Sequence, residues 1–257
     1  MIKILGDENM KKFLGIMMAL FACLSLGSCN KEEAKEDEGI MSYTEFMAAE
    51  SGENVVIRGF IAAKQGFWNN SVSCYLTTDK AGEGYFVFGL PCTENENNST
   101  YAIGNYIEIK ATKTIYAGEH EIMGKDIIDV KQVETTKKQA TTAIDLNDKL
   151  DTLFDYQNSY FTVTMNVKSV SYKGDKGTDD IYLTLTKDDK DLNCCIETNL
   201  TAVSADVYML AMSLEEKIGA SVTVKGYLYW WSDSEDSDVV KANGANPHIT
   251  EIVVNEK

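Results

Sequence analysis

The chain has 257 residues and a formal net charge of −16, and Arg58 is the only arginine among its 24 basic residues. Such an acidic surface repels phosphate backbones, and arginine is the side chain best suited to bidentate contacts with phosphate or guanine. Nucleic acid is therefore disfavoured as a partner.

The first 28 residues have the pattern of a bacterial secretion signal. Lys11 and Lys12 precede an apolar stretch at 13–26, which is too short to cross a bilayer of roughly 30 Å as a helix. Asp7 and Glu8 are unusual in the charged start of a signal, which favours Met10 as the true start. We therefore predict a signal peptide at 1–28 and no transmembrane anchor there.

The sequence LGSC at 26–29 closes this stretch and resembles the lipobox of bacterial lipoproteins at all four positions. The resemblance implies cleavage by signal peptidase II and a Cys29 that carries diacylglycerol and an amide-linked acyl chain such as palmitate. Behind it, Lys31, Glu32 and Glu33 resemble the export signal of surface-exposed lipoproteins in some Gram-negative gut anaerobes. A plain acidic tether is the alternative. We expect a lipid-anchored protein of the outer membrane that faces the cell exterior.

Residues 29–39 are predicted to be the lipidated cysteine and a solvated acidic tether, because seven of the nine residues at 31–39 are charged. The first 28 residues have a net charge of +1, so residues 29–257 carry −17. This body is long enough for two domains of about 100 residues each.

The first half of the body predicts one helix and five strands. Ser42 and Glu45 form a capping box ahead of a short helix at 46–49. Runs rich in β-branched and aromatic residues predict strands at 55–61, 71–76, 85–90, 106–116 and 127–133. The stretch 92–103 is rich in Asn and Glu, so we expect a loop or one helical turn there.

The same order returns in the second half. We predict helices at 146–155 and at 205–217, the latter capped by Ser204, and strands at 160–172, 181–186, 192–197, 221–231 and 249–254. The two units align with rising offsets: Val55 onto Phe161 (106), Val72 onto Ile181 (109), Ile107 onto Val222 (115) and Ile127 onto Ile249 (122). Insertions therefore fall only between strands.

Five short strands, a helix between the third and fourth strands of the second unit, and Gly59 inside the first strand together resemble the OB-fold. The resemblance implies an all-β dominated chain with two tandem five-stranded Greek-key barrels, at 40–134 and 143–257, joined by a connector at 135–142. The predicted interior residues are Val55, Ile57, Ile61, Val72, Leu76, Phe86, Ile107 and Ile109 in the first barrel and Val163, Met165, Leu183, Leu185, Val222, Val224 and Ile252 in the second.

OB-folds bind ligands along the outer face of strands two and three and in the loops that join strands one to two and four to five. Aromatic residues gather at these places, and their faces suit stacking on sugar rings, which need no positive charge. The alternative is that they plug the barrel ends or the contact between domains. The candidate ligand-binding residues are Phe67, Trp68, Tyr75, Tyr85, Tyr227, Tyr229, Trp230 and Trp231.

Metal and disulfide chemistry find little support. The acidic loop with Asp233, Glu235, Asp236 and Asp238 is a weak Ca²⁺ candidate without EF-hand spacing, and we expect no cofactor. Four cysteines remain beside the signal and lipid cysteines. The sequence favours burial of Cys74 and of one of Cys194 and Cys195 as small apolar residues, and it leaves open the disulfide state of Cys74, Cys92, Cys194 and Cys195.

Catalysis is not expected, because no local arrangement singles out a pair of carboxylates or a nucleophile with its base. His120 is expected in an exposed loop at 118–121, and His248 at the start of a strand. The sequence therefore favours a surface module that binds glycan or another uncharged ligand as an accessory to an uptake or degradation system. An assembly lipoprotein that binds protein partners is the second hypothesis, and a nucleic-acid binder is the third.

Overall fold

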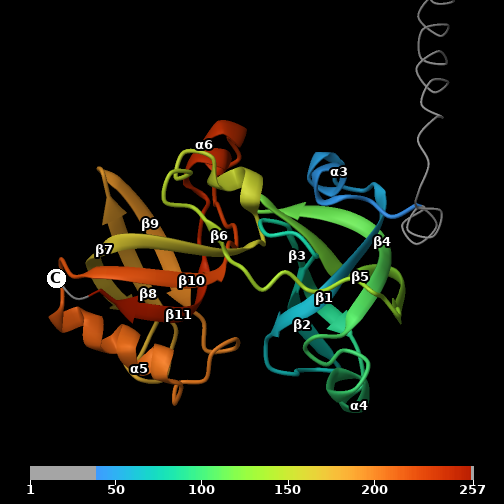
Figure 1. Ribbon diagram of the computed structural model, residues 1–257, viewed down its shortest axis with the longest axis horizontal. Helices are drawn as coiled ribbons and strands as arrows, with labels where there is room; N and C mark the ends of the chain where they lie inside the picture. The colour runs from blue at the N-terminus through green and yellow to red at the C-terminus, as the bar shows by residue number, and fades with distance from the viewer. Residues whose placement is uncertain (1–38, 256–257) are drawn as a thin grey trace, which may run out of the picture. The chain divides into compact units, whose positions relative to one another are not determined.

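The computed structural model describes residues 39–255, and two five-stranded barrels hold most of them (Figure 1). The predicted signal peptide, Cys29, and the export signal of Lys31, Glu32 and Glu33 lie outside the described residues. No helix within residues 39–255 combines the length and the apolar character needed to cross a membrane.

Barrel 1 is closed by five strands in the order β1-β2-β3-β5-β4, the Greek-key order of the OB-fold. They are β1 (Asn54–Lys64), β2 (Ser71–Thr77), β3 (Gly84–Pro91), β4 (Tyr106–Tyr116) and β5 (Glu119–Gln132). Only β3 and β5 pair in parallel. Two short helices flank the barrel, α3 (Tyr43–Ala48) and α4 (Glu94–Asn98), and each begins with a capping box. The predicted first helix and the expected helical turn in 92–103 are confirmed.

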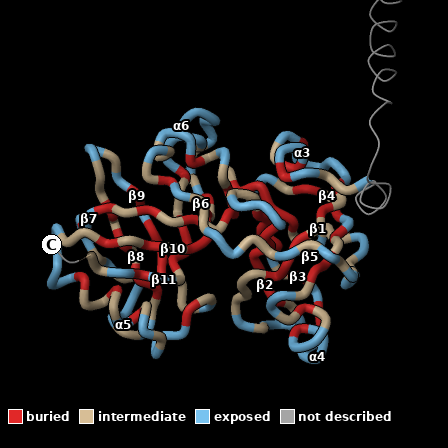
Figure 2. Tube along the Cα trace, in the orientation of Figure 1, coloured by how far each residue is buried: buried red, intermediate tan, exposed pale blue. Residues whose placement is uncertain are grey.

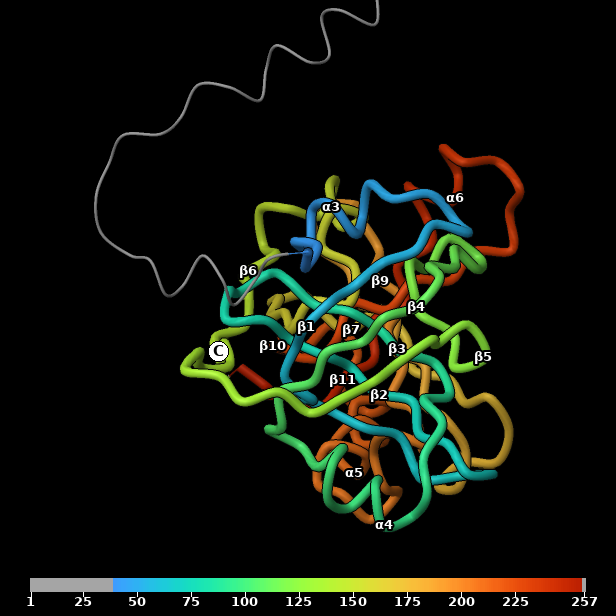
Figure 3. The backbone as a smooth tube through the Cα atoms, turned by 90° about the vertical axis from the view of Figure 1, so that its right-hand side faces the viewer, coloured from blue at the N-terminus to red at the C-terminus, as the bar shows by residue number. Residues whose placement is uncertain are grey.

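Barrel 2 repeats this order in β7 (Tyr160–Tyr172), β8 (Ile181–Lys187), β9 (Lys190–Ile196), β11 (His248–Val254) and β10 (Ser221–Tyr227), and pairing of β10 with β7 closes the ring. The short β6 (Ile144–Asp145) adds to β7. Three helical elements join these strands: the 3-10 turn Leu153–Tyr156, α5 (Asp206–Ser213) with the 3-10 turn Leu214–Glu216, and α6 (Ser237–Asn243). In the turned view, α3 and α6 lie at the top of the two barrels and α4 and α5 lie at the bottom (Figure 3).

Strand register confirms the internal repeat. Three pairs of barrel 1 recur in barrel 2 at the offsets read from the sequence: Gly59 with Ile107 and Met165 with Val222, Ile61 with Leu76 and Val167 with Leu185, and Ile109 with Val130 and Val224 with Ile252. Both first strands also shift register at the same place, directly after Ile61 and Val167. The domain boundaries at 40–134, 135–142 and 143–257 stay a prediction.

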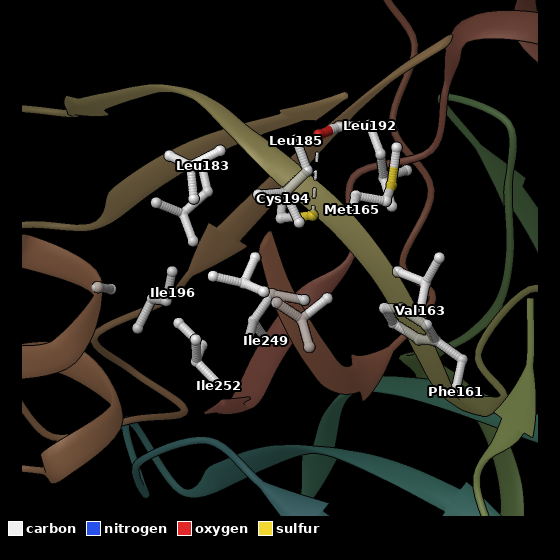
Figure 4. Close-up of a cluster of buried hydrophobic side chains, with 14 of the residues drawn as sticks. Phe161, Val163, Met165, Leu183, Leu185, Leu192, Cys194, Ile196, Ile249 and Ile252 are labelled. Atoms are coloured by element: carbon white, nitrogen blue, oxygen red, sulfur yellow. Dashed lines mark hydrogen bonds between the residues drawn. The ribbon is translucent and has the colours of Figure 1, made fainter. Parts of the chain in front are cut away.

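Each barrel has its own apolar core along its strands (Figure 2). Every predicted interior residue except Phe86 belongs to one of the two cores. Figure 4 shows the core of barrel 2, where Val163, Leu183, Leu185 and Ile249 lie between facing strands. The all-β, two-barrel fold class predicted from the sequence is confirmed.

The predictions that Phe86 of β3 faces the interior and that Tyr85 is available to a ligand are wrong. Tyr85, Val87 and Leu90 belong to the core of barrel 1, whereas Phe86 packs outside it. Tyr85 lies inside because the ring of Phe46 in α3 packs edge-on against it, with centroids 5.1 Å apart. Gly89, at φ +65, then lets the strand turn so that Leu90 as well as Val87 faces the core.

Two helix predictions also need correction. Residues 146–155 form no α-helix, because the Asp145 side chain accepts the Asn147 backbone N–H and β6 pairs with β7, which leaves only a short 3-10 turn. The helix predicted at 205–217 is present as α5 and the following 3-10 turn, but its N-cap is Ala205 and not Ser204. The strand predicted at 221–231 ends at Tyr227.

The exposed loop predicted at 118–121 is a buried strand. Ala117 and Gly118, at φ +50 and +85, form a two-residue turn between the paired Tyr116 and Glu119. So tight a turn starts β5 at once, and Glu119, His120 and Glu121 are buried. A histidine expected to be solvated therefore lies inside the protein.

Two isoleucines of barrel 1 give a matched test of the core. Ile107 is fully buried, whereas Ile128 in β5 is 57% exposed. We expect Ile107→Ala to lower the free energy of unfolding by about 2–5 kcal/mol, because it leaves a cavity. Ile128→Ala removes the same atoms from the surface, so its effect should stay within about 0.5 kcal/mol. Urea unfolding of both variants measures this, and equal losses would contradict the core assignment.

Candidate ligand-binding cleft

The outer face of β2 and β3, where OB-folds bind ligands, is covered by barrel 2 over much of its length. The ring of Tyr75 stacks on that of Tyr227, with centroids 4.4 Å apart and planes 11° from parallel. Phe86 meets Tyr229 edge-on at 5.4 Å. Tyr75 has no exposed surface, so this part of the face is an interface between the barrels.

A buried polar network backs these aromatic rings. The Tyr75 hydroxyl lies at hydrogen-bond distance, 2.8 Å, from His248 Nδ1, and burial lowers the pKa of His248 to about 4, so the ring is neutral. Glu197 Oε2 is 3.5 Å from the same nitrogen, which with a neutral ring is no ion pair. Burial raises the pKa of the Glu197 carboxyl, and Gln65 Nε2 donates to both its oxygens, at 3.0 and 2.8 Å.

A cleft of about 390 Å³ opens where barrel 2 stops covering this face. Trp68 and Phe88 expose 81% and 49% of their surface beside it. The Trp68 backbone exchanges two 3.0 Å hydrogen bonds with Ser71 across Asn69 and Asn70, which both have positive φ, so a tight turn holds the indole at the rim. The lining residues are Gln65, Gly66, Trp68, Ser71, Ser73, Phe88, Gly89 and Asn199.

The lining of this cleft is aromatic and uncharged. The Gly66 N–H donates to the Asn199 carbonyl at 2.8 Å, so both barrels contribute to the wall. Since the Gln65 amide nitrogen donates to Glu197, its carbonyl oxygen is the group left for a ligand. The Ser71 hydroxyl donates to the Trp68 carbonyl at 2.9 Å and keeps its lone pairs. The cleft therefore offers acceptors to a ligand rich in hydroxyl donors.

The eight candidate aromatic residues lie in four places. Trp68 lines the cleft. Tyr75, Tyr227 and Tyr229 meet in the interface between the barrels. Tyr85 and Trp230 are buried in the cores of barrels 1 and 2, and the half-buried Phe67 packs on the core of barrel 1. Trp231, 38% exposed, lies outside the cleft lining.

Phe88, Gln65 and Asn199 line the cleft but are not among the residues predicted from the sequence. Phe88 lies two residues after Phe86 on β3, so the incorrect interior prediction for Phe86 implied an interior position for Phe88 as well. Gln65 adjoins Phe67 and Trp68 in the loop between the first two strands, so it could have been included. Asn199 follows β9 far along the chain, and only the docking of the barrels brings it to this wall.

Comparisons with known proteins identify no family. No protein-family model matches the chain, and no curated protein matches it. A putative aspartyl-tRNA synthetase from Leishmania major Friedlin shares 13% identity at TM-score 0.32 over 48% of this chain, which spans 22% of that protein. The p204 HINb domain shares 12% at TM-score 0.34, covering 80% of this chain and all of that domain (100%). A murine DNA-binding protein bound with double-stranded DNA shares 9% at TM-score 0.36, covering 79% and 97%. Likeness this weak carries no argument about this chain.

One carboxylate of the acidic loop caps a helix, and the four cysteines are buried. Asp236 caps α6 by accepting the backbone N–H groups of Asp238 and Val239. Within residues 39–255 no three potential metal ligands come together. Cys74, Cys92, Cys194 and Cys195 are free and buried, and burial raises the pKa of each thiol.

A second buried polar cluster lies on β4 and β5. Lys113 Nζ donates to the carbonyls of Phe46 and Ala49 at 2.5 Å, so it closes the C-terminus of α3. Burial lowers its pKa to about 8 and that of the neighbouring His120 to about 4. Burial raises the pKa of Glu121 to about 7. None of these groups lines the cleft.

Glu121 should make stability depend on pH. Its folded pKa of about 7 lies above the model-peptide value of 4.5, so the folded state favours the protonated form. The resulting stability is fully present below pH of about 4.5 and is lost as pH rises toward about 7. We expect Glu121→Gln, which stays neutral, to gain stability relative to the wild type across this window, by up to about 3 kcal/mol.

Guanidinium unfolding at several pH values measures this difference. Glu94→Gln in α4 is the control: it removes an exposed carboxylate but leaves Glu121 in place, so the loss of stability toward pH of about 7 should persist. A Glu121→Gln profile parallel to the wild-type profile would contradict a raised pKa at this site.

Proposed function

We propose that this protein is a non-catalytic, lipid-anchored surface protein that binds a neutral saccharide in the cleft of Trp68 and Phe88. One observation carries the proposal: two exposed aromatic rings flank a cleft of about 390 Å³ whose other lining groups are amides, hydroxyls and backbone. Ligand sites commonly combine apolar surface with a few placed polar groups. Sugar rings offer C–H faces for stacking and hydroxyl donors for the acceptors of this cleft.

The charge of the protein supports a neutral ligand. The body carries −17, and no lysine, arginine or carboxylate lines the cleft. An anionic ligand would meet repulsion without a compensating cation. The same facts speak against nucleic acid, since Arg58 pairs with Glu108 at 2.7 Å and is not in the cleft.

The absence of catalysis is part of the proposal. Glu119, Glu121, Glu197 and His248 have pKa values shifted by burial, a property that catalytic groups often share. The side chains of Glu119, Glu197 and His248 contact protein groups, Glu121 is buried, and none of the four lines the cleft. Binding without chemistry suits an accessory to an uptake or degradation system.

The saccharide proposal can be tested by titration calorimetry with neutral hexasaccharides of glucose, xylose and mannose and with hexagalacturonate as an anionic control. We expect one neutral class to bind and the anion not to bind. Trp68→Ala should weaken binding about tenfold, or about 1.4 kcal/mol, because the stacking face is lost. Trp231→Ala is the matched control and should bind as the wild type does. Equal binding by Trp68→Ala and the wild type would remove the cleft from the proposal.

The anchor has its own test. Cys29→Ala removes the only predicted attachment point for acyl chains, and stable anchoring needs such chains. We expect the variant to remain uncleaved or to leave the outer membrane, as measured by fractionation and by incorporation of labelled palmitate. The change of Lys31, Glu32 and Glu33 to alanine should keep the label but reduce cleavage by protease added to intact cells. Normal recovery of Cys29→Ala in the outer membrane would refute the hypothesis that the protein is a lipoprotein.

A further inference from the structure

The equivalent loops of the two barrels meet outside the cleft. In barrel 1 the connection between strands four and five is the turn at 117–118, and in barrel 2 it is the long loop at 228–247. The Ser232 N–H donates to the Ala117 carbonyl at 2.8 Å. Gly118 lies so close to α6 that a Cβ there would be 2.4 Å from Val240 Cγ1. These loops carry ligands in OB-folds, and here they form one surface.

That surface presents a corner of two aromatic rings and a carboxylate, formed by Tyr116, Trp231 and Asp233. The two ring centroids are 5.5 Å apart and the planes meet at 71°, with Tyr116 53% and Trp231 38% exposed. Trp231 Nε1 donates to Asp233 Oδ1 at 3.2 Å, which sets the carboxylate beside the indole. The backbone N–H of Trp231 donates to the Gly244 carbonyl at 2.6 Å, which holds the backbone that carries the indole.

The loop that carries Trp231 and Asp233 is predominantly acidic. The segment 232–246 holds four acidic residues and a single basic one, Lys241. The Lys241 ammonium lies over the ring of Phe154, 5.7 Å from its centroid, and so is engaged elsewhere. Aromatic faces attract cations through the ring quadrupole, and a carboxylate adds a direct counter-charge. No residue of the corner lines the saccharide cleft.

We propose that Tyr116, Trp231 and Asp233 form a second binding site, which takes a lysine side chain from a basic segment of a partner protein. The two rings, whose planes meet at 71°, offer two faces to the alkyl stem and the ammonium of the lysine, and the Asp233 carboxylate pairs with the ammonium. The site needs both barrels, because Tyr116 comes from one and Trp231 from the other. It is independent of the saccharide cleft and would stand if that cleft bound nothing.

The test uses the full chain in detergent and a fluorescein-labelled tetralysine peptide, followed by fluorescence anisotropy. We expect saturable binding that weakens with salt, and none to the same peptide with every lysine Nε-acetylated. Trp231→Ala and Tyr116→Ala should each weaken binding about two- to fivefold, the size of a cation–π contact. Trp231→Phe keeps a ring face and should lose less. Trp68→Ala should bind tetralysine as the wild type does.

Asp233→Asn is compared with Asp79→Asn, which removes one exposed carboxylate from a loop of barrel 1. Only Asp233→Asn should weaken binding. An equal effect of the two changes would overturn the proposal by showing diffuse attraction to an acidic protein. Unchanged binding by Trp231→Ala would overturn it too, as would binding of the acetylated peptide. Near-ultraviolet circular dichroism confirms that each variant is folded.

Discussion

The carboxylate of Glu119 is the contact on which the docking of the two barrels depends. The Trp230 backbone N–H donates to one of its oxygens at 2.7 Å and the Asn158 amide to the other at 2.5 Å. Glu119 is fully buried, and burial raises its pKa. Nearby, the Asn158 carbonyl lies so close to Gly84 that a Cβ there would be 2.3 Å away. The buried hydrogen bond from Trp230 N–H to Glu119 holds the loop that carries Trp231 and α6 in place, because leaving a buried donor without an acceptor would cost free energy.

Docking also explains why two barrels with the same register have different outer faces. Tyr75 and Phe86 of barrel 1 correspond in register to Thr184 and Asn193 of barrel 2. The aromatic pair is covered, whereas the Thr184 hydroxyl and the Asn193 amide bond to each other at 3.0 Å in an exposed position. Ser73 lies two residues before Tyr75 on β2, and Phe88 lies two residues after Phe86 on the antiparallel β3. The cleft is thus the part of the face of barrel 1 that barrel 2 leaves open.

The repeat made much of the fold predictable. Offsets at four strands reproduced the pairing of both barrels, because core packing and strand register must agree. The third strand received no offset, and its phase was wrong. Val87 pairs with Cys74 in barrel 1, and Cys194 pairs with Leu183 in barrel 2. Aligning Val87 with Cys194 gives the third strand an offset of 107, which aligns Tyr85 with the interior Leu192. The error lay in reading that strand alone.

The site was less predictable, because its chemistry depends on contacts between distant residues. Trp68 was chosen for its loop, and its exposure follows from a local turn. Tyr75 and Tyr227 were chosen by the same reasoning, but they cover each other across the interface. His120 and Glu119 read as solvated because they are polar, and no local pattern shows that residues near 158 and 230 would bury them. Periodicity reports which face of a strand is apolar and not what covers the other face.

Trp230 follows Glu119 by 111 positions in the chain, and this separation has a consequence for assembly. Barrel 1 has all five strands by Gln132, so in a chain that emerges N-terminus first its ring can close before the partners of Glu119 arrive. Until then that side chain sits hydrated at the mouth of a finished barrel. Docking therefore removes water from this one acidic group in the same step that covers the rings of Tyr75 and Phe86 with Tyr227.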